Sequence, residues 1–436
     1  MRINNIHIKN FRGYEDLNVE FKSNFNLIIG DNGSGKTAVL EALTIAMGSF
    51  FLGIRNVETK GISPNDIRIA TFEYSEEYQF PVKITTKGKI NNIQLVWERA
   101  LNGLKNRTTS VNAKAIKDHA EMLDNSISIG ENINLPLLGY YATGRLFQEG
   151  YEKINTEKND EKRKPISSRF RAYDRCLEAI STHQKFQNWF RDKEISRIQK
   201  RTEDLSLSLV QEAVINNLPN CKNFYFEFDP DKPQGLKVEF SDGRILPFQS
   251  LSDGTRNFFA LLSDIAYKAI TLNPHLKENV LKETEGIVLI DELDLHLHPE
   301  WQKRIVESLK NTFPKVQFIC TTHSPFIIQA TEPNELLIIK NNNIRENSSG
   351  VNLSIEDIAE IHQKVENPQW SKKREALYQL APKYYEAIKN DTLTNKLKED
   401  FDTAVKPFTM DTALFSIIEE EKILREYLKN KNESSR

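Results

Sequence analysis

Apolar and polar positions along this chain follow patterns that predict an α/β fold. The apolar run FNLIIG at residues 25–30 has the length of one buried parallel strand. After a glycine-rich turn, TAVLEALTIAM at residues 37–47 places its apolar side chains at helical spacing. Two more buried strands are predicted, within EGIVLIDE at residues 285–292 and at residues 316–320. We therefore expect a parallel sheet with turns and helices at the carboxyl ends of its strands.

The turn between the first strand and helix, GDNGSGKT at residues 30–37, is a candidate phosphate-binding loop. Glycines let the backbone wrap phosphates closely, with N–H groups turned inward, and the helix N-terminus adds partial positive charge. Lys36 is expected to reach the β- and γ-phosphates of ATP, and the Thr37 hydroxyl to hold Mg²⁺. The alternative is a chance glycine-rich turn. The expected nucleotide-binding residues of this loop are Asn32, Gly33, Ser34, Gly35, Lys36 and Thr37.

Polar residues at the ends of the two later strands are candidates for hydrolysis. Asp291 is expected to hold Mg²⁺ through water, and Glu292 to orient or deprotonate the attacking water. Glu292 could instead cap the following turn. His323 lies just past the third strand, where it could hydrogen-bond the γ-phosphate or the water; the alternative is a buried histidine with protein partners.

The string LSDGTRN at residues 251–257 predicts a second anion site. Ser252 is a good N-cap for an amphipathic helix, and together with the Gly254 amide it would bind an anion at the helix start. The whole string resembles the signature motif of ABC-type ATPases. In that family the signature of one protomer covers ATP held by the phosphate loop of the other, which implies a homodimer closed around ATP.

The spacing of these motifs resembles the RecF, SMC and OLD branch of that family. The 213 residues from 38 to 250 are more than a transporter-type domain carries, and they lack the heptads of a long coiled coil. DELDLHLHPEWQ at residues 291–302 and the opening IHIKNFRGYEDLNVEF are similar to segments of this branch, which places Arg12 near the nucleotide. The resemblance implies an ABC-type (RecF/SMC-like) ATPase head with a short helical arm insert and a helical C-terminal appendage. Asp294, His296 and His298 could alternatively form a metal cluster.

The insert is predicted to contain strands, a charged loop and two helices. Alternating residues at 66–100 predict strands, and residues 135–147 predict a buried strand followed by Arg145, which with Gln148 could sense nucleotide or lie on the surface. EKINTEKNDEKRK at residues 152–164 has nine charged residues in thirteen, so we expect a mobile loop. Residues 168–218 predict the two arm helices.

Basic residues interleaved with aromatic ones mark the first arm helix. From Lys185 to Arg201 there are six basic and two acidic residues around Phe186, Trp189 and Phe190. Such a stretch could grip a nucleic-acid backbone, so DNA is a possible partner. The alternative is an amphipathic helix with a solvated basic face.

Composition is typical of a cytoplasmic protein. The three isolated cysteines show neither a disulfide framework nor a metal motif. We expect no signal peptide and no membrane span, because the N-terminus begins with a strand and no apolar run approaches about 20 residues. The formal net charge of −2 provides no general basic field for nucleic acid.

The C-terminal region offers no catalytic motif and ends in an amphipathic stretch at residues 413–428, which could dock on its own head or hold a partner. Neither the acidic cluster of a TOPRIM nuclease nor an HNH pattern is present. In size, and in NFRGY, YYATGRL and THSPF, the chain resembles the PtuA ATPases of Septu anti-phage systems, which implies an HNH endonuclease partner (PtuB-like) and a larger assembly.

These observations predict an ATPase that dimerises around ATP and regulates a partner effector nuclease. Two alternatives stay open: a RecF-like DNA-repair ATPase that clamps DNA, and a scaffold that uses ATP as a structural ligand. The expected domains are an ATPase N-lobe at 1–150, a charged loop and arm at 151–220, an ATPase C-lobe at 221–345 and a helical assembly region at 346–436.

Overall fold

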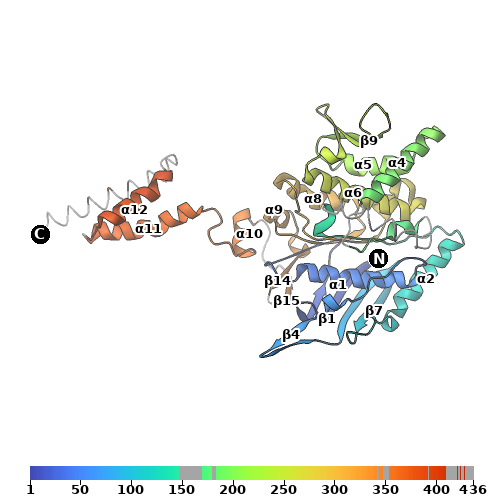
Figure 1. The fold of residues 1–436 in the computed structure, drawn as a ribbon, viewed down its shortest axis with the longest axis horizontal. Coiled ribbons are helices and arrows are strands. Elements are labelled where there is room, and N and C mark those ends of the chain that lie inside the picture. The colour runs from blue at the N-terminus through green and yellow to red at the C-terminus, as the bar shows by residue number, and fades with distance from the viewer. Residues whose placement is uncertain are drawn as a thin grey trace. The chain divides into compact units, whose positions relative to one another are not determined.

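The computed structural model divides the chain into two compact units, Met1–Ile355 and Glu356–Arg436 (Figure 1). The predicted loop at 152–164, Gln148, the side chain of Arg145 and most of the predicted helix at 413–428 lie outside the described residues. The structure describes residues 1–146, 169–178, 183–340, 343–346, 353–390 and 392–408, and the single residues 420, 423 and 427.

A six-stranded sheet forms the centre of the first unit, in the order β15-β14-β3-β13-β12-β8. Its strands are parallel except for β15, which pairs antiparallel with β14 at the edge. The inner strands are buried along their length, as their continuous apolar runs predict. The strands are β3 (Phe25–Gly30), β8 (Leu137–Tyr141), β12 (Gly286–Ile290), β13 (Val316–Thr321), β14 (Leu336–Lys340) and β15 (Asn343–Glu346).

Helix α1 (Lys36–Gly48) lies between this sheet and a four-stranded antiparallel sheet of order β2-β1-β6-β7 (Figure 1). Trp97 Nε1 donates to Ala46 O at 2.9 Å, which ties the second sheet to α1. Helix α2 (Lys114–Ser128) follows this sheet. The strands are β1 (Arg2–Phe11), β2 (Tyr14–Glu20), β6 (Val82–Ile90) and β7 (Ile93–Leu101).

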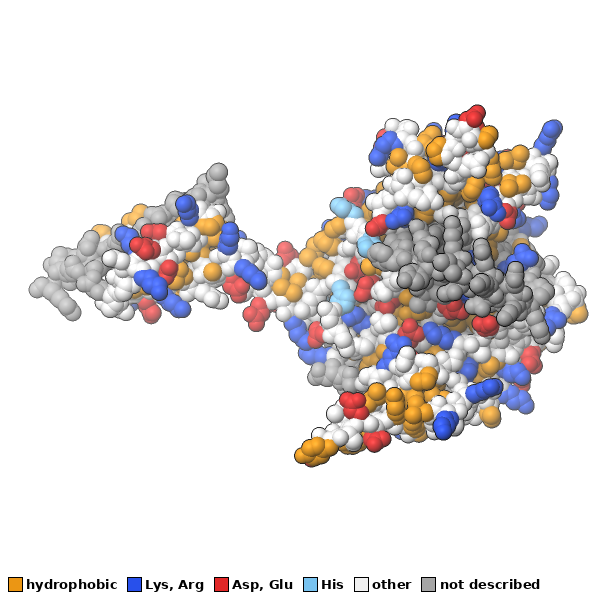
Figure 2. Space-filling view, in the orientation of Figure 1, with side chains coloured by type: hydrophobic (Ala, Val, Ile, Leu, Met, Phe, Trp, Pro, Cys, Tyr) orange, Lys and Arg blue, Asp and Glu red, His pale blue; other side chains and the backbone are white. Residues whose placement is uncertain are grey.

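A separate hairpin, β4 (Ile69–Phe72) with β5 (Ser75–Tyr78), extends from the second sheet. Its side chains are largely exposed, and Tyr74 at the turn is 98% exposed. Figure 2 shows apolar side chains at the end of this hairpin.

Helices α4 (His183–Lys200), α5 (Leu205–Ile215) and α6 (Asp253–Leu272) pack together with a three-stranded sheet of order β11-β10-β9. The predicted arm helices therefore pack on the ATPase unit. Phe186 and Phe190 are buried, with ring centroids 6.3 Å from Phe259 and 5.2 Å from Phe224 respectively. The hypothesis that these two rings contact nucleic acid is wrong, because they belong to the core. The sheet contains β9 (Cys221–Glu227), β10 (Gly235–Phe240) and β11 (Ile245–Pro247).

Among the described residues of the first unit, the remaining α-helices are α7 (Val280–Glu283), α8 (Pro299–Thr312) and α9 (Pro325–Gln329). The expectation that no apolar run has the length to span a membrane needs correction. The stretch Lys36–Gly53 meets that test by length and composition, but it is 83% buried and includes the core helix α1.

The second unit has a small core of its own. Helix α10 (Ile355–Ile361) precedes it, and α11 (Lys372–Lys389) packs against α12 (Asn395–Val405). Tyr384 and Phe401 stack with centroids 3.9 Å apart, and the other buried members of the cluster are Leu377, Tyr385, Ile388 and Val405.

Candidate nucleotide-binding and hydrolysis site

The predicted phosphate loop leaves the end of β3 and enters α1. Gly33 and Gly35 adopt φ values of 77° and 92°, a left-handed backbone that favours glycine and curls the loop. Lys36 is buried, and its Nζ donates to Gly30 O at 2.9 Å and to Asp31 O at 3.0 Å. Asn32 and Gly33 are exposed at the top of the loop. The loop is therefore formed, with its lysine folded back over its own carbonyl groups.

Tyr14 at the start of β2 packs against this loop. Its Oη donates to Ser34 O at 2.8 Å, and its ring fits against Gly35 so closely that an added Cβ there would lie 2.4 Å from Oη. Burial raises the pKa of Tyr14, so the phenol stays protonated and remains a donor. The sequence did not lead us to predict a role for Tyr14. It is the last residue of the string NFRGY, which indicated only a family resemblance.

Three side chains connect the phosphate loop to two strand ends. Thr37 Oγ1 donates to Asp291 Oδ2 at 2.9 Å, and Thr321 Oγ1 donates to Asp291 Oδ1 at 2.6 Å. Thr37 and Asp291 were both predicted to hold Mg²⁺, and the structure brings them together from positions 254 residues apart. Thr321 was not predicted to take part.

Glu292 follows Asp291 in a left-handed conformation with φ 49°, and its N–H donates to Thr321 Oγ1 at 2.8 Å. A non-glycine residue in this region is uncommon and tends to occur at functional sites. Burial lowers the pKa of Lys36, while the carboxylates of Asp291, Asp31, Glu292 and Asp294 oppose that shift. Glu292 is thus within electrostatic reach of the phosphate-loop lysine.

Asp294 joins the segment after β12 to the segment after β13. It accepts hydrogen bonds from Thr322 Oγ1 at 2.5 Å and from His323 N at 3.3 Å, and the His323 side chain is exposed. His298 instead caps α8, with its Nδ1 accepting from Glu300 N at 3.3 Å. Among the residues that the structure describes, no group of three or more His, Cys, Asp or Glu side chains could hold a metal ion. The alternative of a cluster at 294–298 is therefore not supported there.

The predicted signature lies at the N-terminus of α6. Ser252 caps the helix, with its Oγ accepting from Thr255 N at 3.3 Å. Gly254 packs on the segment after β12, and an added Cβ would lie 2.2 Å from His296 O. Asn257 Nδ2 donates to Leu295 O at 2.9 Å in the same segment. Ser252 is exposed, so this helix start faces outward with its cap formed.

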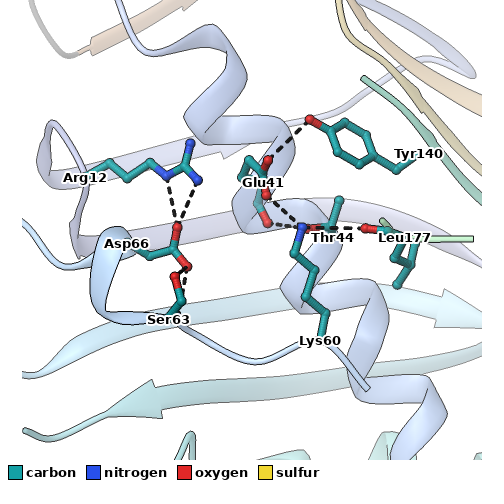
Figure 3. Close-up of polar contacts among 8 residues, drawn as sticks. All are labelled: Arg12, Glu41, Thr44, Lys60, Ser63, Asp66, Tyr140 and Leu177. Carbon is teal, nitrogen blue, oxygen red and sulfur yellow. Dashed lines mark hydrogen bonds and ion pairs between the residues drawn. The ribbon is translucent and has the colours of Figure 1, made fainter. Parts of the chain in front are cut away.

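Arg12 is tied to Asp66. Its Nε and guanidinium Nη2 lie 3.0 and 2.9 Å from Asp66 Oδ1, and Ser63 Oγ donates to Asp66 Oδ2 at 2.8 Å (Figure 3). The same view shows Glu41 of α1, which accepts from Lys60 Nζ at 2.7 Å. Arg12 therefore has a carboxylate partner where sequence reasoning expected a nucleotide contact.

The donors present fit a nucleotide with Mg²⁺. The loop supplies left-handed glycines and a buried lysine, and Ser34 Oγ is buried without a hydrogen-bond partner among the described residues. An oxyanion could accept from such a donor. The oxygen atoms of Thr37 and Asp291 are the ligand type that Mg²⁺ prefers. Bound Mg²⁺ would neutralise charge on the phosphates.

The model of the AAA ATPase domain family AAA_15 matches residues 1–328. The chain belongs to this family. The α/β ATPase-head fold predicted from the sequence is confirmed.

Curated relatives extend the likeness over most of the chain. The Retron Ec83 probable ATPase of Escherichia coli is 27% identical over 411 residues, covering 78% of this chain and 72% of that protein. The Septu protein PtuA of Bacillus thuringiensis is 24% identical over 349 residues, covering 77% and 75%. The predicted resemblance to Septu ATPases is confirmed. An Smc head domain from Pyrococcus furiosus, solved with the C-terminal domain of ScpA, aligns with 84% of this chain and 99% of its own at 16% identity, with a TM-score of 0.44.

Proposed function

We propose that this protein hydrolyses ATP with Mg²⁺ and closes as a homodimer around the nucleotide. The 2.9 Å hydrogen bond between Thr37 Oγ1 and Asp291 Oδ2 carries the proposal, because it joins the two predicted Mg²⁺ ligands at the foot of the phosphate loop. Lys36 would then exchange its two carbonyl acceptors for phosphate oxygens. Asn32, Gly33, Ser34 and Gly35 would contribute the loop around the phosphates.

Glu292 would orient the attacking water, and His323 would contact the γ-phosphate or that water. The left-handed backbone of Glu292 and the hydrogen bond from its N–H to Thr321 Oγ1 support a fixed backbone position from which its carboxylate would reach the water. Asp294, which follows β12, accepts from the His323 backbone N–H just past the end of the neighbouring parallel strand β13. Arg12 would leave Asp66 to approach the nucleotide, since its side chain is 33% exposed and needs no unfolding to move.

The exposed cap at Ser252, with the amide of Gly254, would cover the ATP held by a second copy. A helix N-terminus carries partial positive charge and unpaired N–H groups, which suit a phosphate. No second copy is required to build the phosphate loop itself, so ATP would bind first and the second copy would follow.

We further propose that the dimer regulates a partner effector in a cytoplasmic anti-phage system and works within a larger oligomer. The names of the relatives, a Septu protein and a retron ATPase, support defence. An HNH endonuclease of PtuB type is the partner class we favour, with cleavage carried out by that partner.

Two experiments test these proposals. Glu292→Gln should bind ATP and accumulate as a dimer in light scattering, whereas Lys36→Ala should keep its nucleotide-free mass with ATP present. Co-expression with the product of the adjacent gene should yield a complex whose nuclease activity depends on ATP. A purified chain that neither bound that product nor altered its activity would refute the effector proposal and leave the ATPase proposal standing.

A further inference from the structure

A buried group of three side chains joins the middle of α6 to the end of β8. Tyr141 Oη donates to Asp264 Oδ2 at 2.7 Å, and Lys268 Nζ donates to the same oxygen at 2.6 Å. Lys268 Nζ also lies 3.4 Å from Tyr141 Oη and 4.9 Å from the centre of its ring. The side chains of Asp264 and Lys268 are only 2% and 4% exposed.

Burying this charged group costs free energy, which indicates that the group has a role in fixing the position of a structural element. Burying two charges removes their hydration, and apolar side chains of similar volume often give equal or greater stability. The three-way contact satisfies its charges only when α6 lies at one position relative to β8. Burial, reinforced by the Asp264 carboxylate, raises the pKa of Tyr141, so its phenol stays a donor. The group therefore specifies the position of α6 on the sheet.

The backbone of Tyr141 contacts the predicted Mg²⁺-holding residue directly. Asp291 N donates to Tyr141 O at 2.8 Å, immediately after the parallel pairing of Ile290 with Tyr141. One residue thus has its ring fixed to α6 and its carbonyl group fixed to Asp291. The Asp291 carboxylate is the acceptor that gathers Thr37 and Thr321.

Helix α6 also contacts the segment at residues 291–298, which begins with Asp291. Gly254 packs on His296 O, and Asn257 donates to Leu295 O. Asp264 lies ten residues after Gly254, about 15 Å along the helix axis at 1.5 Å per residue. Helix α6 therefore contacts the segment directly at residues 295–296 and is connected to Asp291 through Tyr141.

We propose that Tyr141, Asp264 and Lys268 are positioning residues that couple the signature end of α6 to Asp291. When Ser252 engages an anion on a second copy, any shift of α6 passes through Tyr141 to the Asp291 backbone. Because such coupling is reciprocal, Mg²⁺ binding near Asp291 also changes the affinity of the signature for its ligand. This inference rests on the proposed composite ATP site.

The test compares Tyr141→Phe with Tyr173→Phe in the full-length protein. Tyr173 is also buried, and its Oη donates to Pro136 O at 2.7 Å, so each change removes the hydrogen bond that a buried phenol donates; Tyr141→Phe also removes the 3.4 Å contact from Lys268 Nζ. Each variant is measured for kcat, for KM, for thermal midpoint, and for the Mg²⁺ concentration that gives half-maximal binding of a fluorescent ATP analogue.

Tyr141→Phe should raise the required Mg²⁺ concentration and lower kcat by about tenfold or more, as when the support of a metal-holding group is lost. Its KM for ATP should stay close to that of wild type, because the phosphate loop is untouched. Tyr173→Phe should lose similar thermal stability and keep the wild-type Mg²⁺ dependence and kcat. Asp264→Asn combined with Ser252→Ala should reduce kcat by less than the product of the single effects.

Wild-type Mg²⁺ dependence in Tyr141→Phe, or equal changes in both tyrosine variants, would overturn the coupling. If wild-type protein bound Mg²⁺ and ATP without hydrolysing it, the proposed hydrolysis would fail while the Mg²⁺ titration still decided the coupling. Absence of Mg²⁺-dependent ATP binding by wild type would overturn both.

Discussion

Replacing Gly35 by alanine tests whether Tyr14 clamps the phosphate loop. The residue has φ 92°, and an added Cβ would lie 2.4 Å from Tyr14 Oη and 2.6 Å from Cζ. A left-handed non-glycine residue costs about 1–2 kcal/mol. Forcing an extra methyl group against a packed ring adds about 1–3 kcal/mol. The total of about 2–5 kcal/mol would be relieved by displacing the loop, since the Tyr14 ring is held in the core.

Gly243→Ala is the matched control for backbone strain. It has φ 86° and nothing within 4 Å of an added Cβ, so it carries the left-handed cost without the collision. Both variants should lower the thermal midpoint, and Gly35→Ala should lower it more.

The decisive assay is the Kd of an ATP analogue by fluorescence. Gly35→Ala should weaken binding by at least about tenfold, because 1.4 kcal/mol corresponds to a factor of ten. Gly243→Ala should bind like wild type. Adding Tyr14→Leu to Gly35→Ala should recover part of the stability lost relative to the sum of the single changes. If Gly35→Ala matched Gly243→Ala in both stability and affinity, the clamp by Tyr14 would be refuted.

Three further predictions concern single side chains. Thr321→Val removes the donor to Asp291 and the acceptor for Glu292 N, so kcat should fall about 10- to 100-fold, while Thr321→Ser should recover most of it. Burial lowers the pKa of Lys36 below 10.5 in the free protein, and a bound phosphate would raise it. ATP affinity should therefore fall as the pH rises through the lowered pKa. In Lys36→Arg the side chain stays charged, so ATP affinity should not change between pH 7 and 10. Burial raises the pKa of Cys176 to about 12, so iodoacetamide at pH 8 should label it only after unfolding; rapid labelling of native protein would show that this thiol is accessible.

Local patterns predicted the parts of the site that lie within one segment. The loop at 30–37 and the strand end at Asp291 follow from apolar runs broken by glycine or acidic residues, and the strand end before Thr321 follows from an apolar run that gives way to Thr-Thr-His. Parallel strands align their carboxyl ends at one edge of a sheet, so the meeting of Thr37 with Asp291 was foreseeable.

Contacts between distant segments could not be predicted in this way. Tyr14 reaches Ser34 because the β1–β2 hairpin folds beneath the loop, and no periodicity encodes that approach. Arg12 pairs with Asp66, a residue 54 positions away in a short 3-10 helix. The arm helix was ambiguous for another reason: Phe186 and Phe190 share a face by spacing, but only the packed structure shows that this face is buried.

The central claim is that the phosphate loop of one copy and the signature of another form one ATPase site. Mixing inactive Lys36→Ala with inactive Ser252→Arg tests it most directly, because a mixed dimer contains one site with both intact parts. Since each mixed dimer has one working site of two, ATP turnover should rise far above that of either variant alone, to at most about half of the wild-type rate. Turnover no higher than the sum of the two variants measured separately would contradict the account.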